Sequence, residues 1–512
     1  MAGAVAPASA EWKRASSEHF IIYSEQKTDE LEEFSRRLEL FDAVVRLGRG
    51  MVDRPVGDGN RVTVYVVKDI DAVQRSYGAR GSGVAGFYNP SVAGPYALTP
   101  ARGDGRGPWS LTEDIIFFHE YGHHLLLQDF ANPAPGWLVE GFAELVSTVR
   151  FESDARVSLG LAANHRGMAV FFRRGIPIET LLKGDYSQLN DYDVYTLYGR
   201  SWMLTHYLTF EASRRGQLDK YLAAIATGAD PLDAARTVFG DLKQLEKDME
   251  KHARAKQLPY IGVPTASLKI SPVKVESLSP GGDAILPLRM QSKRGVSKQT
   301  AGPLAARIRK AAASYPADPL VQVTLAEAEH DADQLDAADA AADRALASDP
   351  SLIEAMIYKG RVAMKRGKDA EGTAKAAHFK DARNWFLKAS ARDPEDPEPL
   401  SLIYASFEDE KIAPTAFAVQ ALHRAARLVP QDDSVRLTSV RQYLRDGKLK
   451  ETRNALLPLS FDPHARKMAE YARELIDLVD RSDPAAALAL IDKRKTEDEG
   501  KDKDKGKKQD CR

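Results

Sequence analysis

The sequence predicts two units: an α+β domain, made of a small mixed sheet plus helices, followed by an all-α domain of helical repeats. Strand-like and helical patterns alternate from residue 12 to about residue 98. From residue 161 to about residue 258 the chain is helical by pattern. Beyond residue 300, proline-containing turns recur at intervals of 34, 44 and 36 residues, and a period near 34 is typical of stacked helix pairs.

Composition narrows the classes of function. The 512 residues suffice for two or three domains with sizeable cores. Because 72 basic residues balance 73 acidic ones, we expect no nucleic-acid partner and no anionic membrane surface. No apolar run is long enough for a membrane span. Cys511 is the only cysteine, so no intrachain disulfide can form.

The first ten residues, MAGAVAPASA, are expected to be a disordered N-terminus. They end in Ala-Ser-Ala, which is similar to a signal-peptidase cleavage site, so they could be the remnant of a signal peptide. A periplasmic or secreted location is therefore expected, with a cytoplasmic one as the alternative.

The α+β domain is expected over residues 11–260. HFIIYSE (19–25) and RVTVYVV (61–67) are rich in β-branched and aromatic residues and predict strands. Residues 29–47 between them have apolar side chains at helical spacing, and 69–77 predict a shorter helix. The glycine-rich stretch 81–96 is expected to hold two short strands, VAGFY and PYALT.

The next predicted helix bears the candidate metal-binding and catalytic residues. Ser110 and Glu113 predict a capping box at its start. His119 and His123 follow, four residues apart and therefore on one helical face, with Glu120 beside them. Two imidazoles and a neighbouring carboxylate are what a zinc-dependent hydrolase needs on its first helix.

A second helix is expected to supply the remaining ligand. Proline and glycine residues break the chain after the first helix, and a new helical pattern begins near Trp137. It presents Glu140 and Glu144 one turn apart. We assign Glu140 as the third ligand of a Zn²⁺ ion. Glu144 is expected to accept the second N–H of His119 and so to orient that ring.

HEYGH (119–123) and WLVEGFAEL (137–145) together resemble the gluzincin zinc metallopeptidases. The resemblance is to the M1 aminopeptidase-like group (peptidase MA) and its bacterial relatives with tetratricopeptide repeats. It implies that His119, His123 and Glu140 bind zinc and that Glu120 is the general base. The loop before Glu140 is slightly shorter than in typical M1 enzymes.

The resemblance also carries expectations about substrate binding. In zincin peptidases the strand before the metal helix lies at the sheet edge and pairs with extended substrate, and 95–99 is the candidate here. M1 aminopeptidases place a glutamate in this region, but residues 81–100 contain no acidic side chain. Aminopeptidase specificity is therefore disfavoured, and the choice between endopeptidase and exopeptidase stays open.

A later helix, expected to begin near Thr196, bears Tyr198 and His206. In M1-like enzymes a tyrosine at the start of such a helix donates a hydrogen bond to the oxyanion. That resemblance makes Tyr198 the candidate catalytic tyrosine and Tyr195 the alternative. For either tyrosine taken singly, aromatic packing in a core helix is the favoured explanation. We expect His206 to be a packed core residue.

Residues 261–300 are rich in proline, glycine and serine and are expected to form a linker or a small β insert. The repeat domain is expected over 301–490, with its turns at YPADP (315–319), SDPSL (348–352), DPEDP (393–397) and VPQDD (429–433). GKDAEGTAKA would be an insertion in the longest interval. The units resemble degenerate tetratricopeptide repeats, which implies a curved solenoid that binds a protein partner or substrate. The charged tail, 491–512, is expected to be disordered.

The function hypothesis is a zinc metallopeptidase acting on a peptide or protein substrate, with a C-terminal repeat domain for recruitment. Two alternatives remain. One is a non-catalytic scaffold in which the zincin domain has lost turnover. The other is a metal-dependent hydrolase of a non-peptide bond, since the same site could perform it.

Overall fold

The computed structural model describes residues 11–53, 56–77, 84–107, 109–128, 134–171, 175–184, 186, 189–461 and 466–494. The expectations for residues 1–10 and for the tail from 495 onward lie outside these ranges. Residues 491–494 are helical and continue a helix that begins at 484. The boundary at 491 expected for the disordered tail is therefore wrong. Within the described part of the chain, no helix is both long and apolar enough to cross a membrane.

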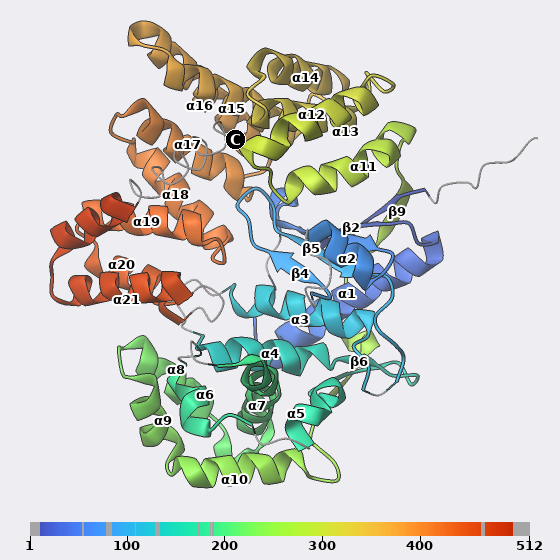
Figure 1. Cartoon of the computed structure of the whole chain (residues 1–512), viewed down its shortest axis with the longest axis vertical. Coiled ribbons are helices and arrows are strands. Elements are labelled where there is room, and N and C mark those ends of the chain that lie inside the picture. Colours follow the sequence, from blue (N-terminus) through green and yellow to red (C-terminus); the bar gives the residue numbers. More distant parts are fainter. Residues whose placement is uncertain are drawn as a thin grey trace, which may run out of the picture.

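An N-terminal α/β unit precedes a helix-rich C-terminal unit (Figure 1). The N-terminal unit contains a six-stranded mixed sheet in the order β4-β5-β3-β2-β1-β9. Strands β2, β3 and β5 are parallel, whereas β4, β1 and β9 pair antiparallel with their neighbours. The strands are β1 (Lys13–Ser16), β2 (Phe20–Ser24), β3 (Val62–Val67), β4 (Phe87–Asn89), β5 (Tyr96–Pro100) and β9 (Lys274–Ser277).

Successive side chains along a strand point to opposite faces of the sheet, and each face of this sheet packs into a separate hydrophobic core. Val62, Val64 and Val66 of β3 face a core shared with α1 (Thr28–Arg49) and α3 (Glu113–Leu126). Tyr65 and Val67 face the opposite side, with α2 (Ile70–Tyr77) and α11 (Pro280–Lys293). Both faces are therefore covered, which explains why β3 reads as a nearly continuous apolar run.

Helix α4 (Gly136–Ser147) lies between two cores, and every one of its residues is buried. Val139, Phe142 and Val146 pack toward the sheet core. Trp137 and Leu145 pack into a second core. The helices of that core are α5 (Gly167–Phe171), α6 (Ile178–Lys183), α7 (Asp191–Phe210), α8 (Gln217–Ala226), α9 (Pro231–Phe239) and α10 (Leu242–Ala253). A helix this apolar on all sides must be interior.

The stretch expected to be a linker or a small β insert belongs to the N-terminal unit instead. Strand β8 (Ile261–Pro264) pairs with β7 (Arg156–Leu159), which also pairs with β6 (Arg150–Phe151) in a three-stranded sheet. Strand β9 completes the six-stranded sheet beside β1. The N-terminal unit therefore extends to residue 277, and the boundary at 260 is wrong because these two strands pair with partners more than a hundred residues earlier.

The C-terminal unit, called the helical array below, begins at α11 rather than at residue 301. Successive helices pack as antiparallel neighbours, and the four expected turns fall between consecutive pairs. The pairs are α11 with α12 (Lys298–Ala312), α13 (Pro319–Asp331) with α14 (Leu335–Ser348), α15 (Ile353–Asp369) with α16 (Gly372–Arg392), α17 (Pro397–Glu410) with α18 (Ala416–Leu428), and α19 (Asp433–Arg445) with α20 (Leu449–Leu456). The ten-residue insertion lengthens α15 and α16 instead of forming a loop.

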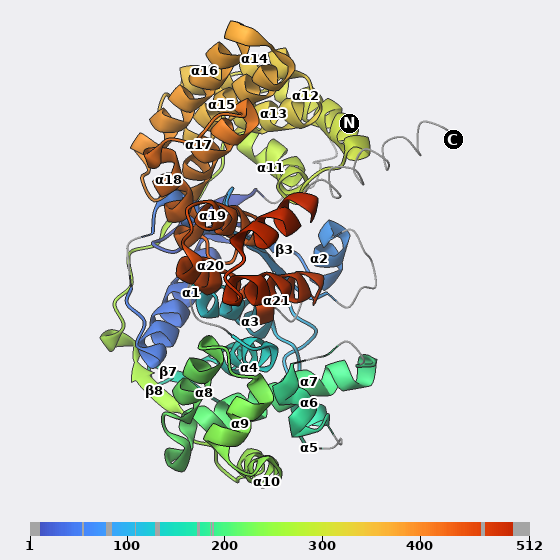
Figure 2. The same cartoon turned by 90° about the vertical axis from the view of Figure 1, so that its left-hand side faces the viewer.

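The helical array curls around the N-terminal unit and returns to it (Figures 1 and 2). It starts beside the sheet with α11 and ends with α20 and α21 (Arg466–Asp480) close to α8. Arg453 of α20 donates to the carbonyl oxygen of Ala226 at 2.9 Å. Asn60 donates to the carbonyl oxygen of Leu428 at 2.9 Å. The array is thus attached to two separate parts of the N-terminal unit.

Candidate metal centre

Helix α3 begins at Glu113 and is capped by Thr112, whose hydroxyl accepts from the backbone N–H of Ile115. The expected capping box at Ser110 is wrong. The Ser110 hydroxyl accepts from Gly107, and the Glu113 carboxylate accepts from Gly103, so both belong to the preceding loop. Threonine serves as an N-cap as serine does, and the later cap leaves the helical face of the motif unchanged.

Two glycines let the helices of the site approach closely. A Cβ atom at Gly122 of α3 would lie 2.7 Å from Val146 Cγ2 and 3.1 Å from Ala143 Cα, both on α4. A Cβ atom at Gly141 of α4 would lie 2.3 Å from the backbone oxygen of Ser201 on α7. Helices α3, α4 and α7 are therefore stacked almost backbone to backbone, and this stacking fixes where their polar side chains meet.

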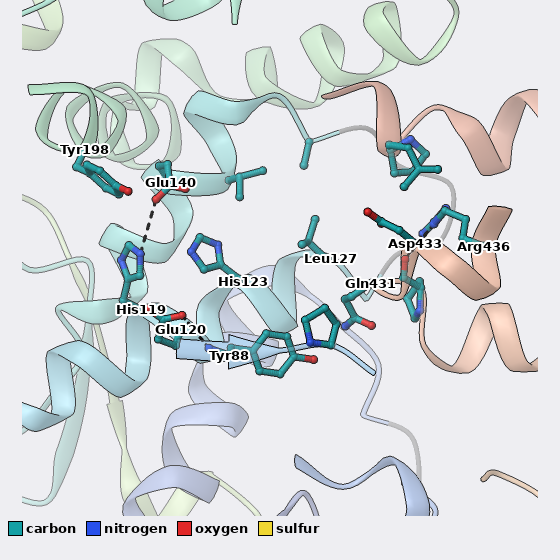
Figure 3. Close-up of a pocket in the computed structure, with 16 residues that line it drawn as sticks. Tyr88, His119, Glu120, His123, Leu127, Glu140, Tyr198, Gln431, Asp433 and Arg436 are labelled. Atoms are coloured by element: carbon teal, nitrogen blue, oxygen red, sulfur yellow. Dashed lines mark hydrogen bonds and ion pairs between the residues drawn. The ribbon is translucent and has the colours of Figure 1, made fainter. Parts of the chain in front are cut away.

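The stacking brings His119, His123 and Glu140 together (Figure 3). One ligand atom from each lies within 4.8 Å of the others, and His119 Nε2 is 3.7 Å from Glu140 Oε2. Around a tetrahedral zinc ion, donors at bond lengths near 2.0–2.1 Å would be ~3.3 Å apart. Two imidazoles and one carboxylate form a donor set that suits zinc, so the residues present fit the ion. The expected convergence of these three side chains is observed; their role as ligands stays a prediction.

Glu144 lies behind His119 and is completely buried. Its Oε1 is 3.2 Å from His119 Nδ1 and also accepts from Arg166, and its Oε2 is 2.7 Å from His165 Nε2. Burial alone would raise the pKa of Glu144, but Arg166 and the two histidines hold it well below its usual value. A permanently anionic Glu144 fixes the proton of His119 on Nδ1 and directs Nε2 toward Glu140.

The ring of His119 is surrounded by negative charge. Burial lowers its pKa, but the hydrogen bond to Glu144 and the charges of Glu144, Glu140 and Glu120 outweigh burial and raise it. An environment that stabilises a proton on this ring equally favours a divalent cation bound to it.

Glu120 lines the same cavity and is held by the neighbouring strand. The backbone N–H of Tyr88 in β4 donates to Glu120 Oε2 at 3.2 Å. β4 is the edge strand of the sheet, whereas β5 lies between β4 and β3. The expectation that 95–99 forms the edge is therefore wrong: the preceding short strand turns back and covers it.

Tyr198 lines the cavity, and among the described residues Tyr195 does not. The Tyr198 ring centroid is 6.1 Å from that of His119, and the guanidinium of Arg166 lies 4.8 Å over the ring. Burial, followed by the charge of Glu140, raises the pKa of Tyr198, so its hydroxyl stays protonated. The helix bearing it, α7, begins at Asp191 with Asn190 as its cap rather than near Thr196.

His206 is packed in the core, as expected. It is fully buried, with Nε2 at 2.9 Å from the carbonyl oxygen of Gly160 and Nδ1 at 2.9 Å from His252 Nε2. Burial lowers its pKa to about 4, so it is neutral in the folded protein.

The helical array forms one side of the cavity, which has a volume of about 430 Å³. The array contributes Pro430, Gln431, Asp433, Arg436, Pro458 and Leu459. Figure 3 shows Gln431, Asp433 and Arg436 across the cavity from His119 and Glu140. Gln431 lies in the turn before α19, and this turn is held by Asp432, whose Oδ2 accepts from the N–H of Val92 at 2.7 Å. The cavity is therefore built by both units.

Sequence reasoning missed the contributions from outside the two motif helices. His165 and Arg166 belong to a short 3-10 helix, Asn164–Arg166, and nothing in their local pattern marks them as partners of Glu144. The array residues come from the turn before α19, from α19 itself and from the segment after α20, and the only local signal there is the repeat period. Gly122 and Gly141 could have been found, because a glycine inside a helix is costly unless another backbone passes close by.

A second group of possible metal-binding side chains consists of Glu18, His19 and Asp53. Here His19 is already paired: Nδ1 is 2.7 Å from Glu39 Oε2, and Nε2 is 3.1 Å from Asp53 Oδ1. Burial lowers the pKa of His19, but the bond to Glu39 and the charge of Asp42 raise it to about 9. Both ring nitrogens of His19 therefore already have a carboxylate partner, and we interpret this group as an ion-pair cluster.

Neither protein-family models nor curated protein sequences give a match to this chain.

Proposed function

We propose that this protein is a zinc-dependent peptidase of the gluzincin type, with a tetratricopeptide-like array as its second unit. The observation that supports this most strongly is the meeting of His119, His123 and Glu140 within 4.8 Å, beside Glu120 in one cavity. A buried carboxylate and two imidazoles on stacked helices are costly to assemble unless a cation joins them.

Each side chain of the site has a distinct role in this proposal. His119, His123 and Glu140 would hold the zinc ion, which would acidify a water molecule and polarise the scissile carbonyl. Glu120 takes the proton of the attacking water and passes it to the leaving amine. Tyr198, kept protonated by its surroundings, donates a hydrogen bond to the developing oxyanion. Glu144 orients His119.

A peptide substrate is favoured by the position of the edge strand. β4 borders the cavity through Tyr88, and Pro90, the residue after the strand, also lines it. An extended peptide can add to such an edge through backbone hydrogen bonds, which does not require a particular sequence. A hydrolase acting on small non-peptide esters or amides would gain nothing from this strand, so we place the peptide bond first.

The helical array is proposed to recruit a protein segment, as stacked helix pairs of this type do through their curved surface. Because the array also forms one side of the cavity, recruitment and hydrolysis would occur on adjoining surfaces. A protein partner held by the array is the further expectation.

The test combines metal analysis with a peptide-library digest read by mass spectrometry. The purified chain is expected to contain about one zinc per molecule and to cleave peptides in a chelator-sensitive manner. Glu120→Gln should retain the zinc and produce no cleavage products. A zinc-loaded parent that cuts no member of the library would contradict the peptidase proposal. Hydrolysis of simple esters by that same parent would indicate a non-peptide substrate.

A further inference from the structure

The residues beside the metal motif form a connected path from the helical array to Glu120. It consists of Gln431 on the array, His124 on α3 and Tyr88 on the edge strand. None of these three side chains is among the proposed zinc ligands or proton carriers, yet Tyr88 and Gln431 both line the cavity.

Tyr88 contacts α3 twice. Its backbone N–H donates to Glu120 Oε2 at 3.2 Å, and its hydroxyl is 2.7 Å from His124 Nδ1. Glu120 and His124 are four residues apart, so they occupy the same face of α3 one turn from each other. The strand can lie this close because residue 86 is glycine: a Cβ there would be 2.5 Å from Ile116 Cγ2.

The direction of the Tyr88–His124 hydrogen bond follows from the neighbours of His124. Arg46 donates to the amide oxygen of Gln128 at 3.2 Å, so the amide nitrogen of Gln128 faces His124 Nε2, at 2.8 Å. That nitrogen can only donate, so Nε2 carries no proton and Nδ1 does. His124 therefore donates to the hydroxyl oxygen of Tyr88.

The array holds the other side of His124. Gln431 Nε2 donates to the backbone carbonyl of His124 at 3.0 Å, near the end of α3. The same nitrogen is 3.4 Å from His124 Nδ1, too long to compete with the 2.7 Å contact of Tyr88. The ring itself is stacked on Tyr121, with centroids 5.0 Å apart, and 7% of the residue is exposed.

We propose that Tyr88, His124 and Gln431 are positioning residues through which the docked array holds the edge strand against the Glu120 carboxylate. The inference rests on the proposed function insofar as Glu120 is the general base. The array would then set the geometry of the proton transfer as well as recruit substrate. None of the three residues needs to touch the reacting atoms for this.

The first measurement is hydrogen exchange of the peptide segment covering residues 86–92, followed by mass spectrometry on the full-length zinc-loaded protein. Tyr88→Phe removes the hydroxyl and keeps the ring, and Gln431→Ala removes the array contact. Both are expected to speed exchange of this segment. Gln334→Ala makes the same kind of change elsewhere in the array, where the side chain donates to the carbonyl oxygen of Ala332. It should exchange as the parent does.

The second measurement separates positioning from general structural damage. Tyr88→Phe and His124→Ala should lower kcat about tenfold with KM and zinc content unchanged, because a misplaced general base slows only the chemical step. His124→Asn places an amide donor where Nδ1 lies and should recover most of the lost kcat. Gln431→Ala should act in the same direction and Gln334→Ala should not.

Unchanged exchange of residues 86–92 in both Tyr88→Phe and Gln431→Ala would overturn the inference. So would a loss confined to KM, or an Asn variant no better than the Ala variant. If the zinc-loaded parent hydrolyses no peptide, the proposed function fails, and the exchange measurement by itself still decides whether the array holds the strand.

Discussion

Nδ1 of His119 lies 3.2 Å from Oε1 of Glu144, a carboxylate that is fully buried and held anionic by Arg166. This contact leaves Nε2 of the same ring facing Glu140. The orientation of the first expected ligand therefore depends on a residue one turn beyond the third.

We expect Glu144→Gln to weaken zinc binding by about 10–100-fold, because an amide can orient His119 in either of two ways and no longer neutralises Arg166. Competition with a chromophoric chelator measures the affinity. Glu329→Gln is the matched control, since Glu329 is also buried and paired with an arginine, Arg309, but lies in the array. Equal zinc affinity in the parent and in Glu144→Gln would contradict the orienting role.

His123→Ala should remove the metal, because two remaining protein ligands are too few for a stable zinc site. The zinc content, measured by metal analysis after gel filtration, is expected to fall from about one ion per chain to near zero. His330→Ala, a half-buried histidine in the array, serves as the control and should keep its zinc. Full occupancy in the His123 variant would mean that the ion is held elsewhere.

Glu120→Gln should keep the zinc and lower kcat by about 10²–10⁴-fold, since the amide cannot accept the proton of the attacking water. The amide can still be held by the N–H of Tyr88 through its oxygen, so the strand should stay in place. Peptide hydrolysis and zinc content are measured on the same preparation. A parent-like rate would exclude Glu120 as the base, and loss of zinc would make it a ligand.

The parts of the site that could be predicted are those encoded by local spacing. His119 and His123 share a helical face, with Glu120 beside it, whatever the tertiary structure, and Glu140 follows after a single break. Local sequence does not identify the edge strand, because two short strands of similar composition flank a turn and only their pairing decides which one is outermost. The array's part in the cavity involves Gln431 and Asp433, some three hundred residues away, and no local pattern reports such a contact.

The difference between local patterns and long-range pairing also explains why the domain boundary expected at residue 260 is wrong. The composition of residues 261–300 predicts a linker or a small β insert, because prolines and glycines interrupt the local patterns there. β9 nevertheless forms a strand, because β1 offers it an open edge. Long-range pairing outweighs weak local preference in this stretch.

Truncation after Leu258 should therefore give a poorly folded protein that binds zinc weakly. The cut removes β8 and β9, exposes the edges of β7 and β1, and deletes α11 from one face of the sheet. Circular dichroism and zinc analysis of the 1–258 fragment provide the measurement. A stable fragment with full zinc would show that the array and both strands are dispensable for the site.

His19 should make the free energy of unfolding fall as the pH becomes alkaline. Its pKa is about 9 when folded and near 6.5 when unfolded, so its contribution is complete below pH 6.5 and disappears as pH rises to about 9. The shift corresponds to at most about 3 kcal/mol. Urea unfolding at about pH 6 and about pH 9.5 should show a smaller loss in His19→Gln than in the parent. Equal losses would contradict the ion-pair assignment.

The attachment of the helical array at two distant points has a consequence for how the molecule denatures. Asn60 lies beside the sheet and Ala226 at the end of α8, and the array bonds to both, at Leu428 and Arg453. Stacked repeats usually unravel piecewise, because each pair contacts only its neighbours. Here the last pairs are fastened to a separate globular core, so they cannot fray from the free end without breaking that attachment. Heat should consequently melt the array and the N-terminal unit in a single cooperative transition.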